Sequence, residues 1–327
     1  MKDSDISILI PTLSRQDFLL KNLRFLAKLK VDFNVCICDS TPKIKPNFRN
    51  KLNKLSKIIK IKYDHKPSFN CREAIFFLIK NCKTDYAAYL GDDDFFIPNG
   101  LINCAEFLSK NLEYRVVYGK AILVDSQSIS QPNLSVKASN YWGSRSFQSS
   151  KPESRLDNLS DNYLVNLFGV HRTNEFLEDF KASSISPSKS MSEILVNYIT
   201  LAKGKGKFLP VTYLIRQTHP SRYVMSGNLI DILIEDNFAE SIPLFISELS
   251  KALIKKKNNS EKDSNALSKK YLRKILESHN KLEKVNKFFH ICRKVFIRIK
   301  YSLKNIIFRN SKYFRGFKVY LKIISQL

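Results

Sequence analysis

The strongest constraint on the fold is a regular alternation of β-rich and helix-like segments through the first 125 residues. Short β-rich runs are expected to form strands at residues 6–10, 33–38, 58–63, 86–90 and from 116 onward. Between them, apolar residues recur at helical spacing in residues 17–28, 51–57, 70–81 and after Pro98. Such alternation with short connections is typical of parallel βαβ units. We therefore predict an α/β fold with a doubly wound, mostly parallel sheet.

After residue 125 the pattern is less regular. We expect an irregular excursion at 126–160, helical or mixed segments at 162–170 and 190–202, a last strand at 208–215, and helices beyond Met225 with a polar break at 255–264. The C-terminal part would thus be a helical extension of the α/β region.

The charge of the chain is concentrated at its C-terminal end. The whole chain holds 55 Lys and Arg against 30 Asp and Glu, a formal net charge of +25. Residues 251–327 hold 22 of the basic residues but only 4 of the acidic ones. A surplus of this size indicates an acidic partner, such as nucleic acid, an anionic membrane or a phosphorylated small molecule.

The six cysteines give no sign of a disulfide framework or a zinc site. No pair has Cys-x-x-Cys spacing, and Cys36 and Cys38 would share one face of a strand, where they cannot easily bridge each other. Reduced thiols in a cytoplasmic protein are the expected state. The first residues do not resemble a signal peptide, and no apolar run approaches the ~18 residues that span a bilayer.

Three consecutive carboxylates, Asp92, Asp93 and Asp94, follow the expected fourth strand, and we call them the Asp triplet. In a doubly wound sheet, ligands bind outside the carboxyl ends of the strands, where Pro11–Thr12 and Asp39–Ser40 also fall. Adjacent like charges repel, and bound Mg²⁺ or Mn²⁺ would relieve that repulsion. The alternative is an acidic surface turn or helix cap. No GxGxxG or GxxxxGK[ST] motif is present, so the common dinucleotide and P-loop signatures are missing.

Five short motifs follow one another along the chain. They are Ile8 to Arg15 (ILIPTLSR), Asp39–Ser40, Leu90 to Asp94 (LGDDD), Ser192–Glu193 ahead of an apolar helix that ends near Gly204, and Tyr213 to His219 (YLIRQTH). Together they resemble the motifs of GT-A glycosyltransferases of the inverting family 2 type, across residues 5–222. Four sites depart from that pattern: Ser14 stands for the usual Asn, residues 38–41 (CDST) for the usual DDGS, Gly91 for the first Asp of the DxD element, and Glu193 for Asp. The departure at Gly91 leaves open which aspartates contact the ribose and which bind the metal.

The resemblance implies a set of contacts to a nucleotide-sugar and a metal ion. The nucleotide contacts would be Pro11, Thr12, Arg15, Asp39, Asn70, Arg72, Asp92 and Asp93. Mn²⁺ or Mg²⁺ would be held by Asp93, Asp94 and His219, and the diphosphate would contact Arg216 and Arg222. The alternatives are surface charge for Arg15, Arg216 and Arg222, an ion pair for Arg72, a turn before Pro42 for Asp39, and a structural role for His219.

Glu193 would be the general base that takes the proton of the acceptor hydroxyl. Ser190 lies three residues before it, so a capping box at the helix start is an equal alternative on the residues alone. The resemblance favours the catalytic role. Asp179 and Glu175 are the next candidates for the base.

The resemblance further implies an enzyme that moves a sugar from a UDP-linked donor to a glycan or lipid-linked acceptor in bacterial surface polysaccharide synthesis. Residues 1–222 would form the GT-A domain, with a nucleotide-binding half at 1–125 and an acceptor half at 126–222, before a helical basic region at 223–327. A nucleotidyltransferase is one alternative, although no Gly-rich triphosphate loop follows the first strand. A non-catalytic binding protein on this fold is another, although the Asp triplet and Glu193 count against it.

Residues 284–327 hold 12 Lys and Arg and no acidic residue. From Phe288 to Ile306, apolar and basic residues fall on opposite sides of a helix, which suits the surface of an anionic bilayer. Two alternatives are that this helix packs on the catalytic domain or on a second copy in a homodimer. Nucleic acid is the least favoured partner, because no binding motif is present. The expected location is cytoplasmic, peripheral at the inner face of the cytoplasmic membrane.

Overall fold

The computed structural model describes residues 5–126, 138–141, 144–161, 163–220, 237–257, 260–288 and 312–327. Its strands are β1 (Ile6–Thr12), β2 (Asn34–Asp39), β3 (Ile61–His65), β4 (Tyr86–Tyr89), β5 (Phe95–Phe96), β6 (Tyr114–Asp125), β7 (Ala138–Asn140), β8 (Val170–Arg172) and β9 (Lys205–Thr218). Its helices are α1 (Gln16–Lys28), α2 (Phe48–Leu55), α3 (Cys71–Lys80), α4 (Pro98–Lys110), α6 (Pro152–Asp161), α7 (Thr173–Ser184), α8 (Lys189–Lys203), α10 (Phe238–Lys257), α11 (Glu261–Phe288) and α13 (Lys312–Ser325), with a 3₁₀ turn η2 (Asn166–Phe168).

The strands form one sheet in the order β3-β2-β1-β4-β8-β6-β9-β5, and β7 pairs with β6. β1 is parallel to both β2 and β4, and β2 is parallel to β3. β6 and β9 are also parallel, whereas β8, β5 and β7 pair antiparallel with their neighbours. The predicted α/β fold with a mostly parallel sheet is confirmed.

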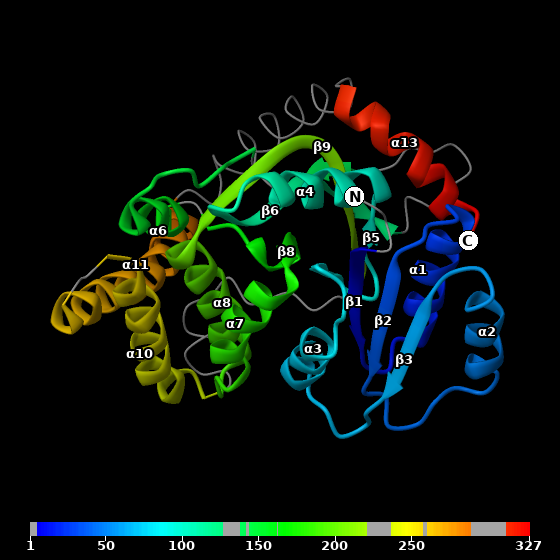
Figure 1. The fold of residues 1–327 in the computed structure, drawn as a ribbon, viewed down its shortest axis with the longest axis horizontal. Coiled ribbons are helices and arrows are strands. Elements are labelled where there is room, and N and C mark those ends of the chain that lie inside the picture. The colour runs from blue at the N-terminus through cyan, green and yellow to red at the C-terminus, as the bar shows by residue number, and fades with distance from the viewer. Residues whose placement is uncertain are drawn as a thin grey trace.

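The side chains of β1 explain why helices cover both faces of the sheet. Ile6, Ile8 and Ile10 are fully buried in a cluster with the apolar face of α1, and Leu9 is fully buried on the opposite face with α3. A strand buried on both sides has a nearly continuous hydrophobic sequence, as β1 does. Figure 1 shows α1 and α2 on one side of the first strands and α3 on the other.

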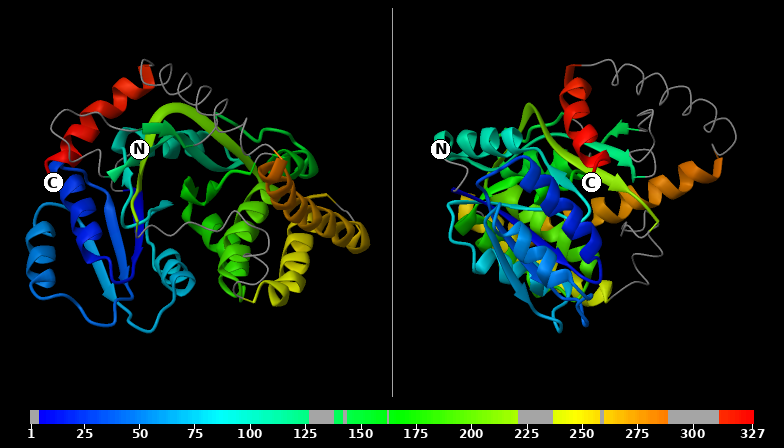
Figure 2. Two further views of the ribbon diagram at one scale, coloured as in Figure 1. Left: turned by 180° about the vertical axis from the view of Figure 1, so that it is seen from behind. Right: turned by 90° about the vertical axis from the view of Figure 1, so that its right-hand side faces the viewer.

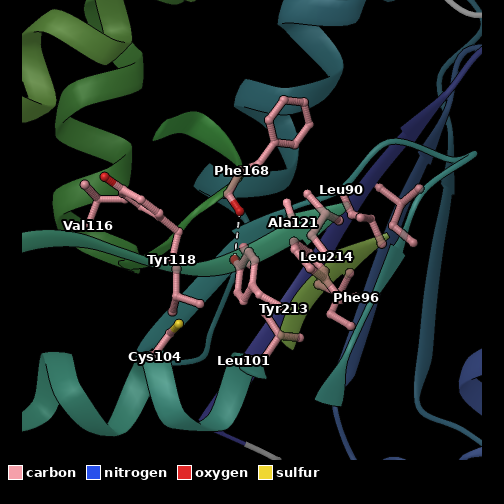
Figure 3. Packing of buried hydrophobic residues seen from close by; sticks show 14 of the residues in the cluster. Leu90, Phe96, Leu101, Cys104, Val116, Tyr118, Ala121, Phe168, Tyr213 and Leu214 are labelled. Carbon is pink, nitrogen blue, oxygen red and sulfur yellow. Dashed lines mark hydrogen bonds between the residues drawn. The ribbon is translucent and has the colours of Figure 1, made fainter. Parts of the chain in front are cut away.

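β6 and β9 form the second part of the core, and β9 arches over the top of the molecule in Figure 1. α4 lies against this pair so closely that a Cβ atom at Gly100 would approach the carbonyl oxygen of Thr212 to 2.3 Å. Figure 3 shows Leu101 of α4 near Tyr213 of β9. The buried Tyr213 hydroxyl donates to the carbonyl oxygen of Phe168 at 2.7 Å. That bond fixes η2 against the central strands.

The C-terminal helices pack on opposite ends of the molecule (Figure 2). α10 and α11 cover α8 and α6, where the rings of Phe245 and Tyr271 lie 5.8 and 6.0 Å from that of Tyr198. α13 packs instead on α1 and β9, and its Leu321 and Ile324 are buried there. The last helix of the chain therefore belongs to the same core as the first.

Most of the predicted amphipathic stretch, residues 289–311, lies outside the described residues. Of the helices that the structure does describe, none combines the length and the hydropathy needed to cross a membrane.

The third strand is displaced from its predicted position. β3 occupies Ile61–His65 rather than 58–63, and Ile58 is 57% exposed. The strand continues through polar residues because His65 pairs in register with Asp39 at the end of β2. Pairing with β2 thus determines where β3 begins and ends, and the local hydrophobic pattern could not predict those bounds.

The prediction of an irregular segment at 126–160 is wrong at its end, where α6 forms. α6 has few apolar residues, and contacts with distant residues hold it. The buried Arg155 donates to the carbonyl oxygens of Leu201 and Ala202, at 2.7 and 3.0 Å, and so satisfies the last turn of α8. This contact joins α6 to the helix that carries Glu193.

Candidate active site

The ends of β1, β2 and β4 meet at one edge of the sheet. Thr12, the last residue of β1, pairs in register with Asp39, the last residue of β2. Leu90 follows β4, and its amide donates to the carbonyl oxygen of Leu9 at 3.0 Å, which brings the Asp triplet to the same edge. Thr12 Oγ1 donates to Asp92 Oδ2 at 2.7 Å. The carboxyl edge of the parallel strands therefore carries the predicted polar groups.

A cavity of about 590 Å³ opens at this edge, between the sheet and the starts of α3 and α8. Of the predicted site residues, it is lined by Pro11, Thr12, Arg15, Arg72, Asp92, Asp93, Glu193 and Arg216. Asp39, Asn70, Asp94 and His219 are described by the structure but do not line it. Arg222 lies outside the described residues. The fold thus gathers most of the predicted residues around one space.

Asp92 is buried at the floor of the cavity. Arg15 Nη2 lies 3.4 Å from its Oδ1 atom, and Thr12 donates to its other oxygen. Burial raises the pKa of Asp92 to about 7, and the neighbouring charges of Asp93 and Asp94 act in the same direction. Arg15 and Thr12 oppose that shift because they stabilise the carboxylate.

Asp93 contacts two basic side chains from distant parts of the sequence. Its Oδ2 atom accepts from Arg15 Nη2 and lies 2.7 Å from His219 Nε2. The His219 ring stacks on Phe18 at 4.5 Å between centroids, and the Arg15 guanidinium lies over the same ring. Although burial opposes ionisation, the hydrogen bonds and charges of Arg15 and His219 lower the pKa of Asp93.

Asp94 is fully buried and binds β9. Its Oδ2 atom accepts from Arg216 Nε at 2.8 Å, and its Oδ1 atom accepts from the backbone amide of Gln217 at 3.1 Å. Asn22 of α1 donates to its carbonyl oxygen at 2.6 Å. Both carboxylate oxygens are therefore engaged in holding the last strand to the Asp triplet.

The Asp triplet offers a divalent cation fewer ligands than its sequence suggests. Asp94 is engaged by β9, and Arg15 lies against both Asp92 and Asp93. Asp93 and His219 remain as an adjacent carboxylate and imidazole, a pair suited to Mn²⁺. In the part of the chain that the structure describes, no group of three or more His, Cys, Asp or Glu side chains could hold an ion. A cation here would fit only with further oxygens, such as those of a diphosphate.

Asp39 is fully buried at the end of β2. Its oxygens accept from Gln16 Nε2 at 2.7 Å, from the Tyr63 hydroxyl at 2.8 Å and from the Thr41 amide at 2.8 Å. The bond from Thr41 closes the turn before Pro42, which was the alternative role given for Asp39. In this structure Asp39 binds three parts of the protein together.

Asn70 is exposed and begins α3. Its side chain accepts from the amides of Arg72 and Glu73, while Glu73 reaches back to the Asn70 amide in a complete capping box. This cap fixes the first turn of α3, and the first turn places Arg72 and Cys71 in the cavity wall. Asn70 thus positions a wall residue.

Glu193 lies in the cavity wall, in the second turn of α8. The helix is capped by Ser188, whose hydroxyl accepts from the Met191 amide at 3.1 Å, so a capping box between Ser190 and Glu193 is wrong. Burial raises the pKa of Glu193, and the charges of Arg216 and Lys189 and a hydrogen bond from Tyr163 oppose that rise. Glu193 is therefore a partly buried carboxylate with no role at the helix end.

The two reserve candidates for the base lie in a separate ion-pair network. Asp179 is fully buried, where it accepts from Arg115 Nε at 2.7 Å and contacts Lys203 Nζ at 3.0 Å. Glu175 pairs with Arg172 at 3.1 Å. This network joins α7 to β6 and to the end of α8, and neither Asp179 nor Glu175 lines the cavity.

Several cavity residues were not predicted. They are Cys71, Tyr89, Tyr141, Tyr163, Phe168 and Lys189. Arg216 lies over the rings of Phe168 and Tyr141, with its Cζ atom 4.3 and 4.8 Å from the two centroids, and donates to the Tyr141 hydroxyl at 2.6 Å. Tyr141 falls in the predicted irregular excursion, and Tyr163 and Phe168 fall in the segment expected to be helical or mixed. No sequence signal distinguished them as cavity residues.

The sequence of the N-terminal half identifies the family. Residues 7–166 match the family model described as glycosyl transferase family 2. This part of the chain belongs to that family. The match spans β1 and the Asp triplet and includes 16 of the 24 residues that line the cavity, and it makes the protein a glycosyltransferase. No protein of curated function matches the sequence.

The fold of the whole chain is similar to that of S. aureus TarS residues 1–349. The crystal structure of that protein with UDP superposes with a TM-score of 0.56 at 17% identity, covering 90% of this chain and 73% of that one. Its complex with UDP-GlcNAc gives a TM-score of 0.51 at 16% identity, with 88% and 92% covered. At these identities the likeness shows the fold, which is of the GT-A type, as the motifs implied.

The contacts of Asp94 predict a structural role for this residue. Asp94→Ala leaves Arg216, whose side chain is only 12% exposed, without its carboxylate partner and should destabilise the protein by about 3–5 kcal/mol. Thermal unfolding with and without Mn²⁺ measures the loss, which should be the same in both. Asp93→Ala is the matched variant and should cost less, because Arg15 is a quarter exposed and water can replace its partner. Equal melting temperatures of Asp94→Ala and wild type would contradict this role.

Proposed function

We propose that this protein transfers a sugar from a UDP-linked donor to a glycan or lipid-linked acceptor with inversion at the anomeric carbon. One observation supports this most directly: a single cavity joins the carboxylates of Asp92 and Asp93 to Glu193 on α8. The two aspartates lie at the edge of the sheet where doubly wound folds bind nucleotides. Glu193 lies across the cavity, where it can act on an acceptor.

The family assignment supports a nucleotide-sugar donor. TarS, which has a similar fold, is described in complexes with UDP and with UDP-GlcNAc, and we extend a UDP-linked donor to this chain. In the proposed complex, Pro11 and Thr12 lie beside the nucleoside, and Asp92 accepts hydrogen bonds from the ribose. Arg72 and Arg216 line the same cavity and are placed to bind the diphosphate.

In the proposed reaction, Glu193 removes the proton of the acceptor hydroxyl as that oxygen attacks the anomeric carbon. The burial that raises the Glu193 pKa makes the carboxylate a stronger base. Arg216 remains paired with Asp94 and presents its charge to the departing diphosphate. Mn²⁺ or Mg²⁺, held by Asp93 and His219, would neutralise further charge on that leaving group.

The proposal also covers the kind of acceptor and the place in the cell where the enzyme acts. A lipid-linked acceptor suits an enzyme held at an anionic membrane, and the basic stretch between α11 and α13 is the candidate for that attachment. α13 itself packs on α1 and β9, so its buried face is not available to a bilayer. We propose a cytoplasmic enzyme, peripheral at the membrane, active in bacterial surface polysaccharide synthesis.

The proposed base is tested by Glu193→Gln, which keeps the side-chain shape but cannot accept a proton. Turnover should fall about 10²–10⁴-fold while UDP affinity stays unchanged. In the wild type, kcat should decrease as the pH falls through the Glu193 pKa, at a pH above the ordinary glutamate value. Glu178→Gln, on an exposed part of α7, is the control and should behave as wild type. Normal turnover in Glu193→Gln would move the base elsewhere.

The proposed cation is tested by calorimetric titration of UDP with Mn²⁺ or with EDTA. UDP should bind several-fold more tightly with Mn²⁺, because Asp93 and His219 alone are too few ligands to hold the ion without the diphosphate. Asp93→Ala should remove the difference, and Asp17→Ala, an exposed aspartate on α1, should keep it. Equal wild-type affinity in EDTA would exclude a cation from UDP binding.

The proposed membrane contact is tested without disturbing α13. Replacing Arg293, Lys294, Arg298, Lys300 and Lys304 by Gln removes the basic face of the predicted helix. Sedimentation with phosphatidylglycerol vesicles should fall sharply, because the attraction is electrostatic. Phosphatidylcholine vesicles are the control and should bind little of either protein. Undiminished sedimentation of the variant would contradict the attachment.

A further inference from the structure

The guanidinium group of Arg216 is held by contacts on several sides. Its Nε atom donates to Asp94 Oδ2 at 2.8 Å, and its Nη1 atom donates to the Tyr141 hydroxyl at 2.6 Å. Its Cζ atom lies 4.3 Å from the centroid of the Phe168 ring and 4.8 Å from that of the Tyr141 ring. The three partners come from different parts of the chain, and all of them act on this one side chain.

The bond to Tyr141 adds a constraint that Asp94 alone cannot supply. A single hydrogen bond at Nε would let the guanidinium group rotate about the line that joins it to Asp94. The second bond, at Nη1, removes that freedom, and the neighbouring rings stabilise the cation through their π faces. The hydroxyl of Tyr141 therefore determines the direction of the remaining N–H groups.

These contacts leave part of the guanidinium group available for a ligand. An arginine has five N–H groups, and Asp94 and Tyr141 accept from one each. The other three are not used by the hydrogen bonds that Arg216 makes within the described residues. Because Arg216 lines the cavity and its planar group matches the oxygens of a phosphate, these N–H groups can bind an anion there.

Two parts of the fold determine where the rings of Tyr141 and Phe168 lie. The Tyr141 amide follows β7 and donates to the carbonyl oxygen of Ala121 in β6 at 3.0 Å. The carbonyl oxygen of Phe168 accepts from the buried Tyr213 hydroxyl at 2.7 Å (Figure 3), and the Phe168 ring stacks on Tyr89 with centroids 5.1 Å apart. The sheet thus fixes both aromatic residues from their backbones, and they in turn fix Arg216.

We propose that Tyr141 and Phe168 orient Arg216 so that its remaining N–H groups bind the diphosphate of the donor. The inference rests on the proposed function, in which Arg216 contacts that diphosphate. A side chain that is already oriented loses little further freedom when it binds an anion, so it binds more tightly than a mobile one. Tyr141 and Phe168 are positioning residues, because they act on the diphosphate through Arg216.

The proposal is tested by comparing UDP with uridine, which lacks the diphosphate. Tyr141→Phe keeps the half-buried ring and removes the hydroxyl that accepts from Arg216, so UDP should bind about ten-fold more weakly in calorimetric titration. Uridine affinity, measured by NMR titration in the same buffer, should keep its wild-type value. A defect that is merely structural would weaken both ligands, so the ratio of the two affinities decides the question.

Tyr114→Phe is the matched control for that measurement. Its hydroxyl bonds to Gln148 at 3.1 Å, and neither residue lines the cavity. The variant therefore loses a tyrosine hydroxyl outside the site, and its ratio of UDP to uridine affinity should equal that of the wild type. A wild-type ratio in Tyr141→Phe as well would overturn the proposal.

A double-mutant cycle shows whether Tyr141 acts through Arg216. Arg216→Lys keeps the charge opposite Asp94 but loses the planar group, so UDP affinity should fall at least as far as in Tyr141→Phe. The double variant should bind UDP no more weakly than Arg216→Lys alone, since the hydroxyl no longer has the group that it orients. Additive losses would show that Tyr141 acts on UDP independently of Arg216 and would overturn the positioning role.

The same variants separate this inference from the proposed function. If Arg216→Lys binds UDP as tightly as the wild type, Arg216 does not bind the diphosphate, and the contact proposed for it fails together with its positioning. If Arg216→Lys binds UDP weakly and Tyr141→Phe keeps the wild-type ratio, only the positioning role is wrong.

Discussion

The burial of three adjacent carboxylates is the constraint on which this structure depends. Asp92, Asp93 and Asp94 lie together at the edge of a sheet, where water is largely excluded. Their mutual repulsion must be balanced within the protein, and Arg15 from the start of α1 and Arg216 from β9 supply the charge. The same contacts join the start of α1 to β9, two elements that lie about two hundred residues apart in the sequence. The two arginines that balance the charge of the Asp triplet therefore also form part of the cavity wall.

Sequence alone predicted the parts of the fold that local pattern controls. β1, β2, β4 and their helices lie in the expected order, because each buries a face that its own residues define. β5 and β8 were missed because two or three residues carry no periodicity, and both exist only through pairing with β9 and β4. α6 was missed because its stability comes from the end of α8, through Arg155. Tertiary contacts decided these cases.

The candidate site was also predicted only in part, and for the same reason. The strand ends with Thr12 and Asp92 and the helix with Glu193 were predicted, since motifs at fixed offsets located them. The distant partners of each side chain could not be predicted: Asp94 holds β9 through Arg216, and Asp39 binds Gln16 and Tyr63. Only the local turn of Asp39 was among the alternatives that the sequence offered. The aromatic residues that line the cavity could not be predicted for a different reason. A tyrosine such as Tyr163 has the same sequence signal in a core as in a cavity.

The order of contacts around the Asp triplet has a consequence for synthesis of the chain. Arg15 precedes the triplet, but Arg216, Gln217 and His219 follow it by more than a hundred residues. A ribosome therefore completes β1, β2 and β4 long before the groups that balance the Asp triplet exist. Contacts of such separation form slowly and late, since a long loop must close first. A chain cut short before β9 would carry the residues predicted to contact the nucleoside, but it would lack Arg216 and the other groups that hold the Asp triplet.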